Sequence, residues 1–364
     1  MTKLDGSVGD HFILGLRPSL TLADADRALL SELRPSGVIV YKSNFHHDVP
    51  YADWLASFRA LLFDVRKAIG RERIFIGIDH EGGRVCRTPK PITRFAYARH
   101  WVNEAAAVGR AMGNELASLG VNLSFAPVLD VDSNPKNPVI GQRAFASDPE
   151  AVAAAALLFA DALAAEGVIA CGKHFPGHGD TAQDSHYALP VVDRDLEGLR
   201  ARELVPFAAA ARAKIPMIMT AHVMFPPIDR EVPATLSRRF VHGILREELG
   251  YDGVVVSDDI GMNAVSEIFD DPTAAVRLLA SGTDLLMVCS HFTSTERARG
   301  FARAITDAIA RGDLDRTEVA RSRARLHALL DRTPQHAVIE LPADVLAIHR
   351  TAGAQFEAAT VEVV

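Results

Sequence analysis

The chain has 364 residues, of which 48% are hydrophobic and 23% charged, and its net charge is −7. This composition is typical of a globular protein with a large core, and it argues against nucleic acid or an anionic membrane surface as the main partner. The first residues contain no apolar segment of the signal-peptide kind, and no apolar run reaches membrane-spanning length, so we expect a cytoplasmic protein without membrane insertion.

Short β-branched runs alternate with longer amphipathic runs along the chain. The runs predicted as strands are 12–16, 37–41, 74–79, 122–127, 168–174, 217–220, 253–257 and 284–288. The runs predicted as helices are 21–33, 51–69, 104–119, 151–166, 196–213, 238–249, 273–281 and 293–311, with Thr21 and Ser237 as N-caps. Eight strand–helix pairs predict an α/β fold, a single-domain (β/α)8 TIM-type barrel over residues 1–335. We expect residues 336–364 to pack on the barrel or trail from it, without a second domain.

An open doubly wound sheet is the rival fold for this pattern. It would place a Gly-rich dinucleotide turn after the first strand, but residues 15–21 read GLRPSLT and lack that motif. The barrel also predicts where polar residues gather, because Asp79, His174, His222 and Asp258 each follow a predicted strand closely. The carboxyl ends of barrel strands form one mouth, where active sites of this fold lie, so these four side chains should meet there.

The segment 173–186 reads KHFPGHGDTAQDSH and is the densest polar stretch of the chain. Asp184 and His186 lie two residues apart, so the carboxylate can orient the imidazole for acid/base catalysis. Such a pair is also typical of a solvated loop, but its position beside the predicted mouth favours a functional role. Asp258 lies in VVVSDDIGM and can act as a nucleophile, a base or a metal ligand, while the adjacent Asp259 can cap the next turn.

Other polar residues near the predicted mouth can bind a ligand. Lys173 and His174 can hydrogen-bond it, and nothing near Lys173 indicates the lowered pKa that a Schiff-base lysine needs. IDHEGGRVCR, residues 78–87, places Asp79, Glu81, Arg84 and Arg87 around a Gly-Gly turn. Carboxylates and guanidinium groups can bind sugar hydroxyls, although Arg84 is also typical of a surface salt bridge.

A metal site is a weaker interpretation of the polar cluster. The possible ligands are His174, His178, Asp180, His186 and His222. Barrel metallohydrolases usually carry H-x-H at the end of the first strand, where this chain reads FILGLRP. The cysteines Cys86, Cys171 and Cys289 are odd in number and lack metal-ligand spacing, which predicts reduced core thiols. We therefore expect no metal and no cofactor.

Four motifs together resemble glycoside hydrolase family 3: IDHEGGRV, NPVIGQRAFASDP, GKHFPGHGDTAQDSH and SDDIGM. The resemblance runs from the first strand to about residue 335, and it is specifically to the single-domain bacterial β-N-acetylglucosaminidases of the NagZ type. It implies a TIM-type barrel that releases non-reducing terminal β-linked N-acetylglucosamine, in many members from muropeptides during peptidoglycan recycling. The implied partner is a small carbohydrate or muropeptide, bound by a monomer or weak oligomer.

The resemblance also implies roles for individual residues. Asp258 would be the nucleophile that forms a glycosyl–enzyme intermediate, and His186 would be the acid/base with Asp184 as its partner. The residues implied to bind the sugar are Asp79, Arg87, Arg143, Lys173 and His174. Retention of configuration needs a nucleophile and a proton shuttle, and a His paired with Asp can replace the usual second carboxylic acid. Because the shuttle lies on a Gly-containing loop, we expect this loop to close over the substrate.

Two features depart from the family pattern. Gly261 stands where members often have serine, and the C-terminal FEAATVEVV resembles the point where two-domain members continue. In two-domain β-glucosidases the acid/base comes from outside the barrel, so the presence of His186 favours the acetylglucosaminidase branch. A phosphorylase remains open, because a neutral His admits a phosphate anion that a carboxylate would repel. A non-catalytic sugar-binding barrel and a metal-dependent barrel hydrolase are less favoured hypotheses, which the sequence leaves open as well.

Overall fold

The structure is a computed structural model, and it describes residues 7–183, 188–289 and 295–357. Eight parallel strands form one sheet in the order β7-β6-β5-β4-β3-β2-β1-β8. Their bounds are β1 Phe12–Gly15, β2 Gly37–Val40, β3 Phe75–Ile78, β4 Leu123–Ser124, β5 Ile169–Phe175, β6 Met217–Thr220, β7 Val254–Val256 and β8 Leu286–Val288. All eight predicted strands are therefore confirmed, although most are slightly shorter than their apolar runs.

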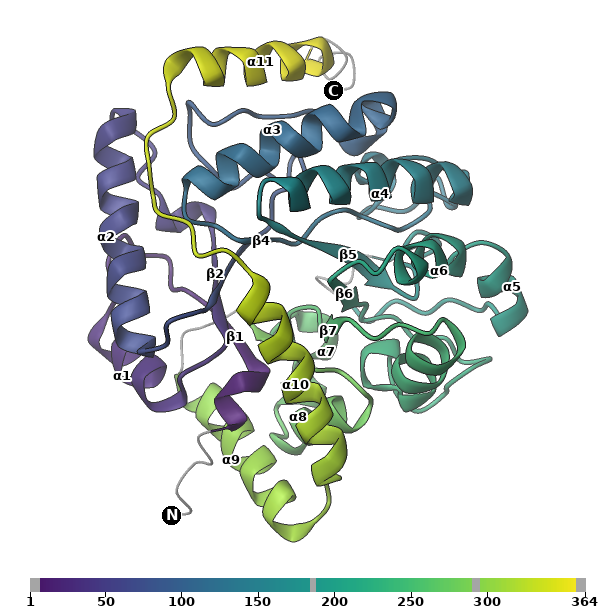
Figure 1. The fold of residues 1–364 in the computed structure, drawn as a ribbon. Coiled ribbons are helices and arrows are strands. Elements are labelled where there is room, and N and C mark those ends of the chain that lie inside the picture. The colour runs from purple at the N-terminus through teal and green to yellow at the C-terminus, as the bar shows by residue number, and fades with distance from the viewer. Residues whose placement is uncertain (1–6, 184–187, 290–294, 358–364) are drawn as a thin grey trace.

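The sheet closes on itself between β7 and β8. Val256 forms a parallel bridge with Leu285. The backbone N–H of Ser257 donates to Leu285 O at 2.9 Å, and Leu285 N–H donates to Val255 O at 3.0 Å. This closure, with helices outside the ring of strands (Figure 1), confirms the TIM-type barrel.

Side chains add further hydrogen bonds across this seam. The N–H of Met287 donates to Ser257 Oγ at 3.0 Å, and the N–H of Cys289 donates to Asp259 Oδ1 at 2.9 Å. Both acceptors lie within three residues of the end of β7. The end of this strand is therefore held to its neighbour by side chains as well as by the backbone.

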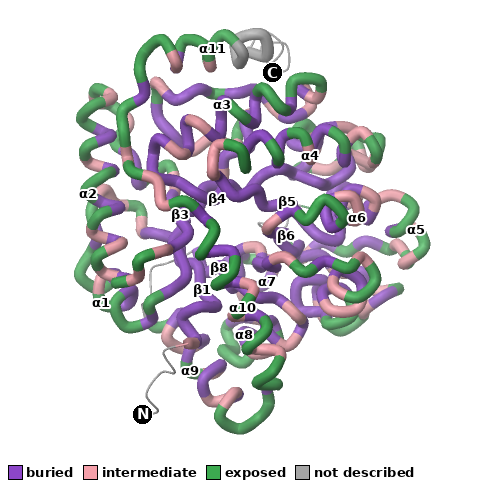
Figure 2. The backbone as a smooth tube through the Cα atoms, in the orientation of Figure 1, coloured by how far each residue is buried: buried purple, intermediate pink, exposed green. Residues whose placement is uncertain are grey.

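Helices cover the outside of the barrel, and Figure 2 shows the strands buried beneath them. Their bounds are α1 Asp24–Leu33, α2 Tyr51–Ile69, α3 Ala105–Ser118, α4 Pro149–Ala165, α5 Leu196–Ala201, α6 Leu204–Arg212, η7 Arg239–Glu248, α7 Asn263–Phe269, α8 Thr273–Ala280 and α9 Thr295–Arg311. The predicted helix over 196–213 is interrupted between α5 and α6. Thr21 is not a cap, because α1 begins after Ala23. The N-cap of η7 is Arg238 rather than the predicted Ser237, but Ser237 Oγ accepts from Phe240 N–H in the first turn at 3.3 Å.

One helix that the sequence analysis missed closes the amino-terminal end of the barrel. This helix is α10, Arg316–Arg332, and it crosses the ring of strands in Figure 1. Leu326, Leu329 and Leu330 join the apolar side chains inside the barrel, such as Phe75 and Met217. Their spacing of three and one residues, on one face of a helix, is the signal that could have predicted it.

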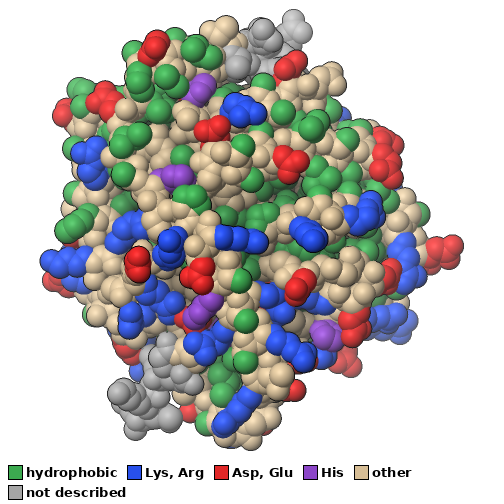
Figure 3. Space-filling model, viewed as in Figure 1, with side chains coloured by type: hydrophobic (Ala, Val, Ile, Leu, Met, Phe, Trp, Pro, Cys, Tyr) green, Lys and Arg blue, Asp and Glu red, His purple; other side chains and the backbone are tan. Residues whose placement is uncertain are grey.

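The segment after α10 returns along the outside of the barrel to α11, Ala343–Glu357, beside α3. The N–H of Ile339 donates to Ser118 O at 2.8 Å, and His349 Nδ1 lies 2.9 Å from Glu115 Oε1. Residues after 335 thus contact the barrel. In the described ranges, none of the helices combines the length and apolar character needed to cross a bilayer. On the face seen in Figure 3, acidic and basic side chains are interspersed.

Candidate active site

The carboxyl ends of the strands surround a cavity of about 460 Å³. Six residues proposed from the sequence line it: Asp79, Arg87, Arg143, Lys173, His174 and Asp258. His222, which the barrel hypothesis also placed at the mouth, is fully buried and donates from Nε2 to Asp259 O at 3.0 Å. Asp184 and His186 fall outside the described residues. Of the eight residues to which the family resemblance gave roles, the structure therefore brings six to one cavity.

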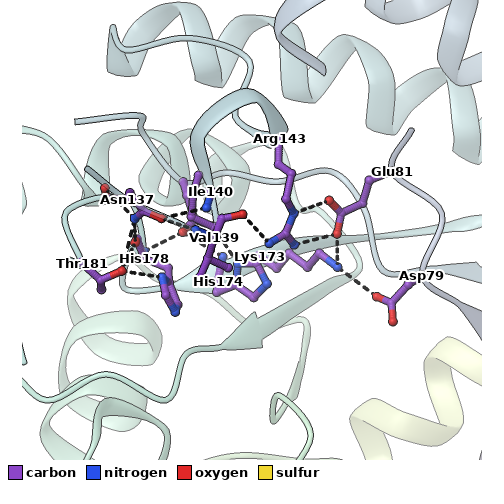
Figure 4. A network of polar contacts seen from close by, with 12 residues as sticks. Asp79, Glu81, Asn137, Val139, Ile140, Arg143, Lys173, His174, His178 and Thr181 are labelled. Atoms are coloured by element: carbon purple, nitrogen blue, oxygen red, sulfur yellow. Dashed lines mark hydrogen bonds and ion pairs between the residues drawn. The ribbon is translucent and has the colours of Figure 1, made fainter. Parts of the chain in front are cut away.

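A chain of ion pairs forms one wall of this cavity (Figure 4). Glu81 accepts hydrogen bonds from Arg143 through Nε at 2.8 Å and Nη2 at 2.9 Å. Lys173 Nζ lies 2.6 Å from Glu81 Oε1 and 3.0 Å from Asp79 Oδ1. Because Asp79 directly follows β3 and Lys173 lies in β5, the parallel strands bring these partners together at the same end of the barrel.

The charges of this network stabilise one another. Burial by itself raises the pKa of Glu81, but Arg143 and Lys173 outweigh it and hold that pKa well below its ordinary value. Burial would lower the pKa of Lys173, but Glu81 and Asp79 raise it. Lys173 is therefore a cation at neutral pH, which disfavours the Schiff-base role. The sequence analysis named Glu81 as a possible sugar ligand and missed its role in holding two cations.

The two arginines of the β3 loop occupy different positions. Arg87 lines the cavity, and its buried Nε has no hydrogen-bond partner among the described residues, so a donor is left for a ligand. Arg84 also lines the cavity, but its Nη2 donates to the backbone oxygen of Val139 at 2.8 Å. Among the described residues Arg84 has only backbone acceptors and forms no ion pair. It supports the loop that carries Arg143.

Asp130 fixes the start of the β5 loop and was missed from the sequence. Its Oδ1 accepts from the N–H of His174 at 3.1 Å and of His178 at 2.7 Å, and its Oδ2 accepts from His174 Nδ1 at 2.7 Å. Burial raises the pKa of Asp130, but the two histidines outweigh it and the pKa is lowered. Because Nδ1 of His174 donates to this carboxylate, Nε2 is the ring nitrogen left for a ligand.

The loop after His178 is also held by side chains. His178 Nδ1 lies 3.0 Å from Thr181 Oγ1, and Asn137 Nδ2 donates to His178 O at 2.8 Å. Asp180 pairs with Arg194 and Arg202. Through these contacts, His178 and Asp180 shape the loop. Within the described ranges, no three or more His, Cys, Asp or Glu side chains form a group that could hold a metal ion.

His178 predicts a pH dependence of folding stability. Burial, with His174 next, lowers its pKa to about 4, whereas an unfolded histidine titrates at about 6.5. As the pH falls, His178 is protonated in the unfolded chain at a higher pH than in the folded protein. The free energy of unfolding therefore falls by up to about 3 kcal/mol as the pH drops through this window. We expect His178→Gln to reduce the decrease in Tm between about pH 7 and pH 4 relative to the original chain. Parallel Tm profiles for the two proteins would contradict this.

The adjacent carboxylates of the β7 loop have separate tasks. Asp259 Oδ1 accepts from Gly261 N–H at 2.9 Å and from Cys289 N–H, so Asp259 holds the turn, as the sequence analysis expected of one acid. Asp258 is partly exposed and lines the cavity. Burial raises the pKa of Asp258. This effect is outweighed by four neighbouring groups, so the pKa lies below its ordinary value; the groups are His222, His174, the Asp259 N–H and Lys173. Asp258 is therefore an ionised carboxylate at neutral pH.

A family model accounts for most of the chain. Residues 13–329 match the model described as glycosyl hydrolase family 3 N terminal domain. The chain belongs to glycosyl hydrolase family 3. The family predicted from the four motifs is thereby confirmed.

Curated family 3 relatives share about a third or more of the aligned residues. The chain is 38% identical over 280 residues to a beta-hexosaminidase of Chromobacterium violaceum, covering 74% of this chain and 76% of that protein. It is 34% identical over 331 residues to beta-hexosaminidase A of Pseudoalteromonas piscicida, covering 84% of this chain and 55% of that protein. The chain thus spans about half the length of the latter relative.

Solved family 3 structures share the fold over nearly the whole chain. A β-N-acetylglucosaminidase from Paenibacillus sp. superposes with a TM-score of 0.85 at 33% identity, covering 96% of this chain and 68% of that one. NagZ from Neisseria gonorrhoeae, in complex with N-trifluoroacetyl-D-glucosamine, superposes with a TM-score of 0.75 at 29% identity. That match covers 95% of this chain and 97% of the NagZ chain.

Proposed function

We propose that this chain hydrolyses the bond between a non-reducing terminal β-linked N-acetylglucosamine and its aglycone, with retention of configuration. The observation that carries the proposal is that ionised Asp258 shares one cavity with the Lys173–Glu81–Arg143 network. A carboxylate nucleophile surrounded by fixed donors and acceptors is what a retaining glycosidase needs. The names of the relatives, beta-hexosaminidases and β-N-acetylglucosaminidases, support the choice of sugar.

In the proposed first step, a carboxylate oxygen of Asp258 attacks the anomeric carbon of the bound sugar. The bond to the aglycone oxygen breaks, and His186 gives that oxygen a proton, which leaves a glycosyl–Asp258 ester. In the second step His186 takes a proton from water, and the water oxygen displaces Asp258 from the anomeric carbon. Asp184 would orient the imidazole and stabilise its charged form.

The remaining cavity residues are proposed to hold the sugar. Asp79 and Lys173 can accept from and donate to ring hydroxyls, and Arg87 has an unpartnered buried Nε among the described residues. Arg143 and His174 complete the proposed set. Because ion pairs already fix Lys173 and Arg143, little side-chain entropy is lost when the sugar binds, which favours tight positioning.

The proposed activity is tested by comparing nitrophenyl β-N-acetylglucosaminide with nitrophenyl β-glucoside, in buffers with and without phosphate. We expect nitrophenol release from the first substrate and free N-acetylglucosamine as the product in both buffers. The sugar 1-phosphate as the product in phosphate buffer would instead establish the phosphorylase. Activity on the glucoside alone would overturn the sugar assignment. Muropeptides from peptidoglycan are the proposed natural substrate and form a further arm of the same assay.

The acid/base role proposed for His186 predicts a dependence on the leaving group. A sugar leaving group needs a proton, whereas nitrophenolate departs without one, so His186→Ala should affect the two substrates differently. We expect kcat/KM for a disaccharide to fall by about 10²–10⁴-fold, and a much smaller loss of the glycosylation rate with the nitrophenyl substrate. Gln183 is exposed and lies on the same loop, so the variant Gln183→Ala is the control. Equal losses on both substrates would count against proton transfer by His186.

A further inference from the structure

A second cavity lies at the amino-terminal end of the barrel, opposite the candidate active site. Its volume is about 290 Å³, and residues 250–252 and 282–283, which come shortly before β7 and β8, line it. The rest of its wall comes from η7, α8 and α10, the helix that closes this end of the barrel (Figure 1). Among the described residues, the walls of this cavity and of the candidate active site have no member in common.

A buried charge cluster beside this second cavity has a net positive charge. Asp284 is 0% exposed, and it accepts from Arg246 Nη2 at 2.5 Å and from Arg325 Nη2 at 2.8 Å. Burial raises the pKa of Asp284, but Arg246 and Arg325, with the N–H of Val255, outweigh it and lower that pKa. One carboxylate therefore faces two guanidinium groups, which leaves one positive charge uncompensated. Because an unpaired charge away from water is costly, the cluster favours an anion beside it.

Two shielded polar atoms of the cavity wall lack a hydrogen-bond partner in the described part of the chain. They are Arg246 Nε and Ser322 Oγ. The other two nitrogens of Arg246 donate to three backbone oxygens and to Asp284, so Nε is the donor that the protein leaves over. Ser322 is 7% exposed. Buried polar groups in proteins are nearly always paired, so two unpaired ones on one cavity indicate that an acceptor binds there.

The same wall offers further cationic donors. Arg325 already uses Nε and Nη2, but its Nη1 lies 3.8 Å from Asp252 Oδ1, which is beyond hydrogen-bond distance. Arg321 forms no ion pair within the described ranges. The two carboxylates of the wall offset little of this charge. Glu318 is already paired with Arg238 at 2.8 Å, and the side chain of Asp252 is 94% exposed.

We propose that this second cavity binds a phosphate group, carried either by inorganic phosphate or by a small organic phosphate ester. Arg246, Arg321 and Arg325 supply the positive charge, and Arg246 Nε and Ser322 Oγ are among the donors. Guanidinium groups form strong, charge-assisted hydrogen bonds with phosphate oxygens. These donors belong to two different helices, η7 and α10, and a tetrahedral phosphate offers oxygens in more directions than a planar carboxylate does.

The proposed ligand would stabilise the folded barrel. Its donors come from η7 and from α10, which are far apart in the sequence and meet only in the folded chain. A ligand that binds the folded state alone raises Tm as its concentration rises. The second cavity lies at the end of the barrel opposite Asp258, so this effect does not depend on the proposed hydrolysis of a sugar.

Binding is tested by calorimetric titration and by Tm on the full chain, in a chloride buffer of fixed ionic strength. The probes are inorganic phosphate and glucose 6-phosphate, with glucose as the uncharged control. We expect about 10 mM of a phosphate probe to raise Tm by about 1–2 °C, and glucose to have no effect. Tighter binding of one probe identifies the free ion or the ester as the occupant. The absence of binding by both phosphate probes would overturn the proposal.

Substitutions on α10 locate the binding site. Arg321 is exposed, so Arg321→Ala should fold normally, and we expect it to weaken phosphate binding by about tenfold or more. Ser322→Ala should weaken it as well. Arg316→Ala is the matched control, because Arg316 is exposed on the same helix but does not line the cavity. All three variants should release nitrophenol at the rate of the original chain.

The same comparison distinguishes this cavity from other sites of phosphate action. Phosphate can also stabilise proteins because it is excluded from their surface, and the cations of the candidate active site could attract it. Either effect would persist in Arg321→Ala as it does in Arg316→Ala. Equal affinities and equal rises in Tm for these two variants would therefore overturn the proposal, whatever the substrate of the enzyme is.

Discussion

Asp258→Asn should lower kcat for the nitrophenyl β-N-acetylglucosaminide by about 10⁴-fold or more, equivalent to about 5.5 kcal/mol of transition-state stabilisation. The amide is nearly the same size as the carboxylate but cannot form the ester with the anomeric carbon. The burst of nitrophenol that signals an accumulated intermediate should also disappear. Because Asp258 is partly exposed and its neighbours remain, the variant should keep its fold.

The matched control is the adjacent carboxylate. In Asp259→Asn the amide oxygen can still accept from the N–H groups of Gly261 and Cys289, so the turn is retained. We expect its kcat to exceed that of Asp258→Asn by at least about 100-fold. The reverse order of the two variants would assign the nucleophile to Asp259.

Glu81→Ala should be the most destabilising change in the cavity. It leaves two buried cations, Arg143 and Lys173, without their shared carboxylate, and an uncompensated buried charge costs about 3–5 kcal/mol. For a chain of this length, a loss of this size corresponds to a decrease in Tm of about 4–7 °C. The same change should raise KM, because the freed side chains no longer hold their positions. Thermal unfolding and steady-state kinetics on one preparation measure both effects.

A surface ion pair provides the control for this loss. Glu248 lies 2.7 Å from Arg200, and both side chains are substantially exposed. Because exposed pairs contribute little, Glu248→Ala should leave Tm nearly unchanged. Similar decreases in Tm for the two variants would mean that removing a carboxylate from the buried Glu81 network costs no more than removing one from an exposed ion pair.

The fold was predictable because each barrel strand is a continuous apolar run. Such a run must be buried on both faces, and eight of them in alternation with helices leave few architectures. The positions of Asp79, His174 and Asp258 followed from the same rule, since polar residues that end parallel strands share one edge of the sheet. These three side chains line one cavity, whereas His222, predicted by the same rule, is fully buried and does not line it.

The sequence did not predict which side chains pair with each other across different loops. Glu81 pairs with an arginine 62 positions away, and Asp130 holds backbone N–H groups 44 and 48 positions away. Neither spacing leaves a periodic signal. The same is true of Arg84, whose acceptor is a backbone oxygen on the next loop. A residue type and its distance from a strand end predict that a side chain reaches the mouth, but not which partner it meets there.

The seam between β7 and β8 links the stability of the barrel to the position of Asp258. The side chains that accept from the N–H groups of Met287 and Cys289 belong to Ser257 and Asp259, the residues on either side of Asp258, the proposed nucleophile. Any fluctuation that parts the two strands must break these bonds and displace Asp258 with them. Slow hydrogen exchange at these two amides would therefore report how firmly Asp258 is held. A substitution far from the cavity that loosens the seam would reduce turnover without touching the sugar.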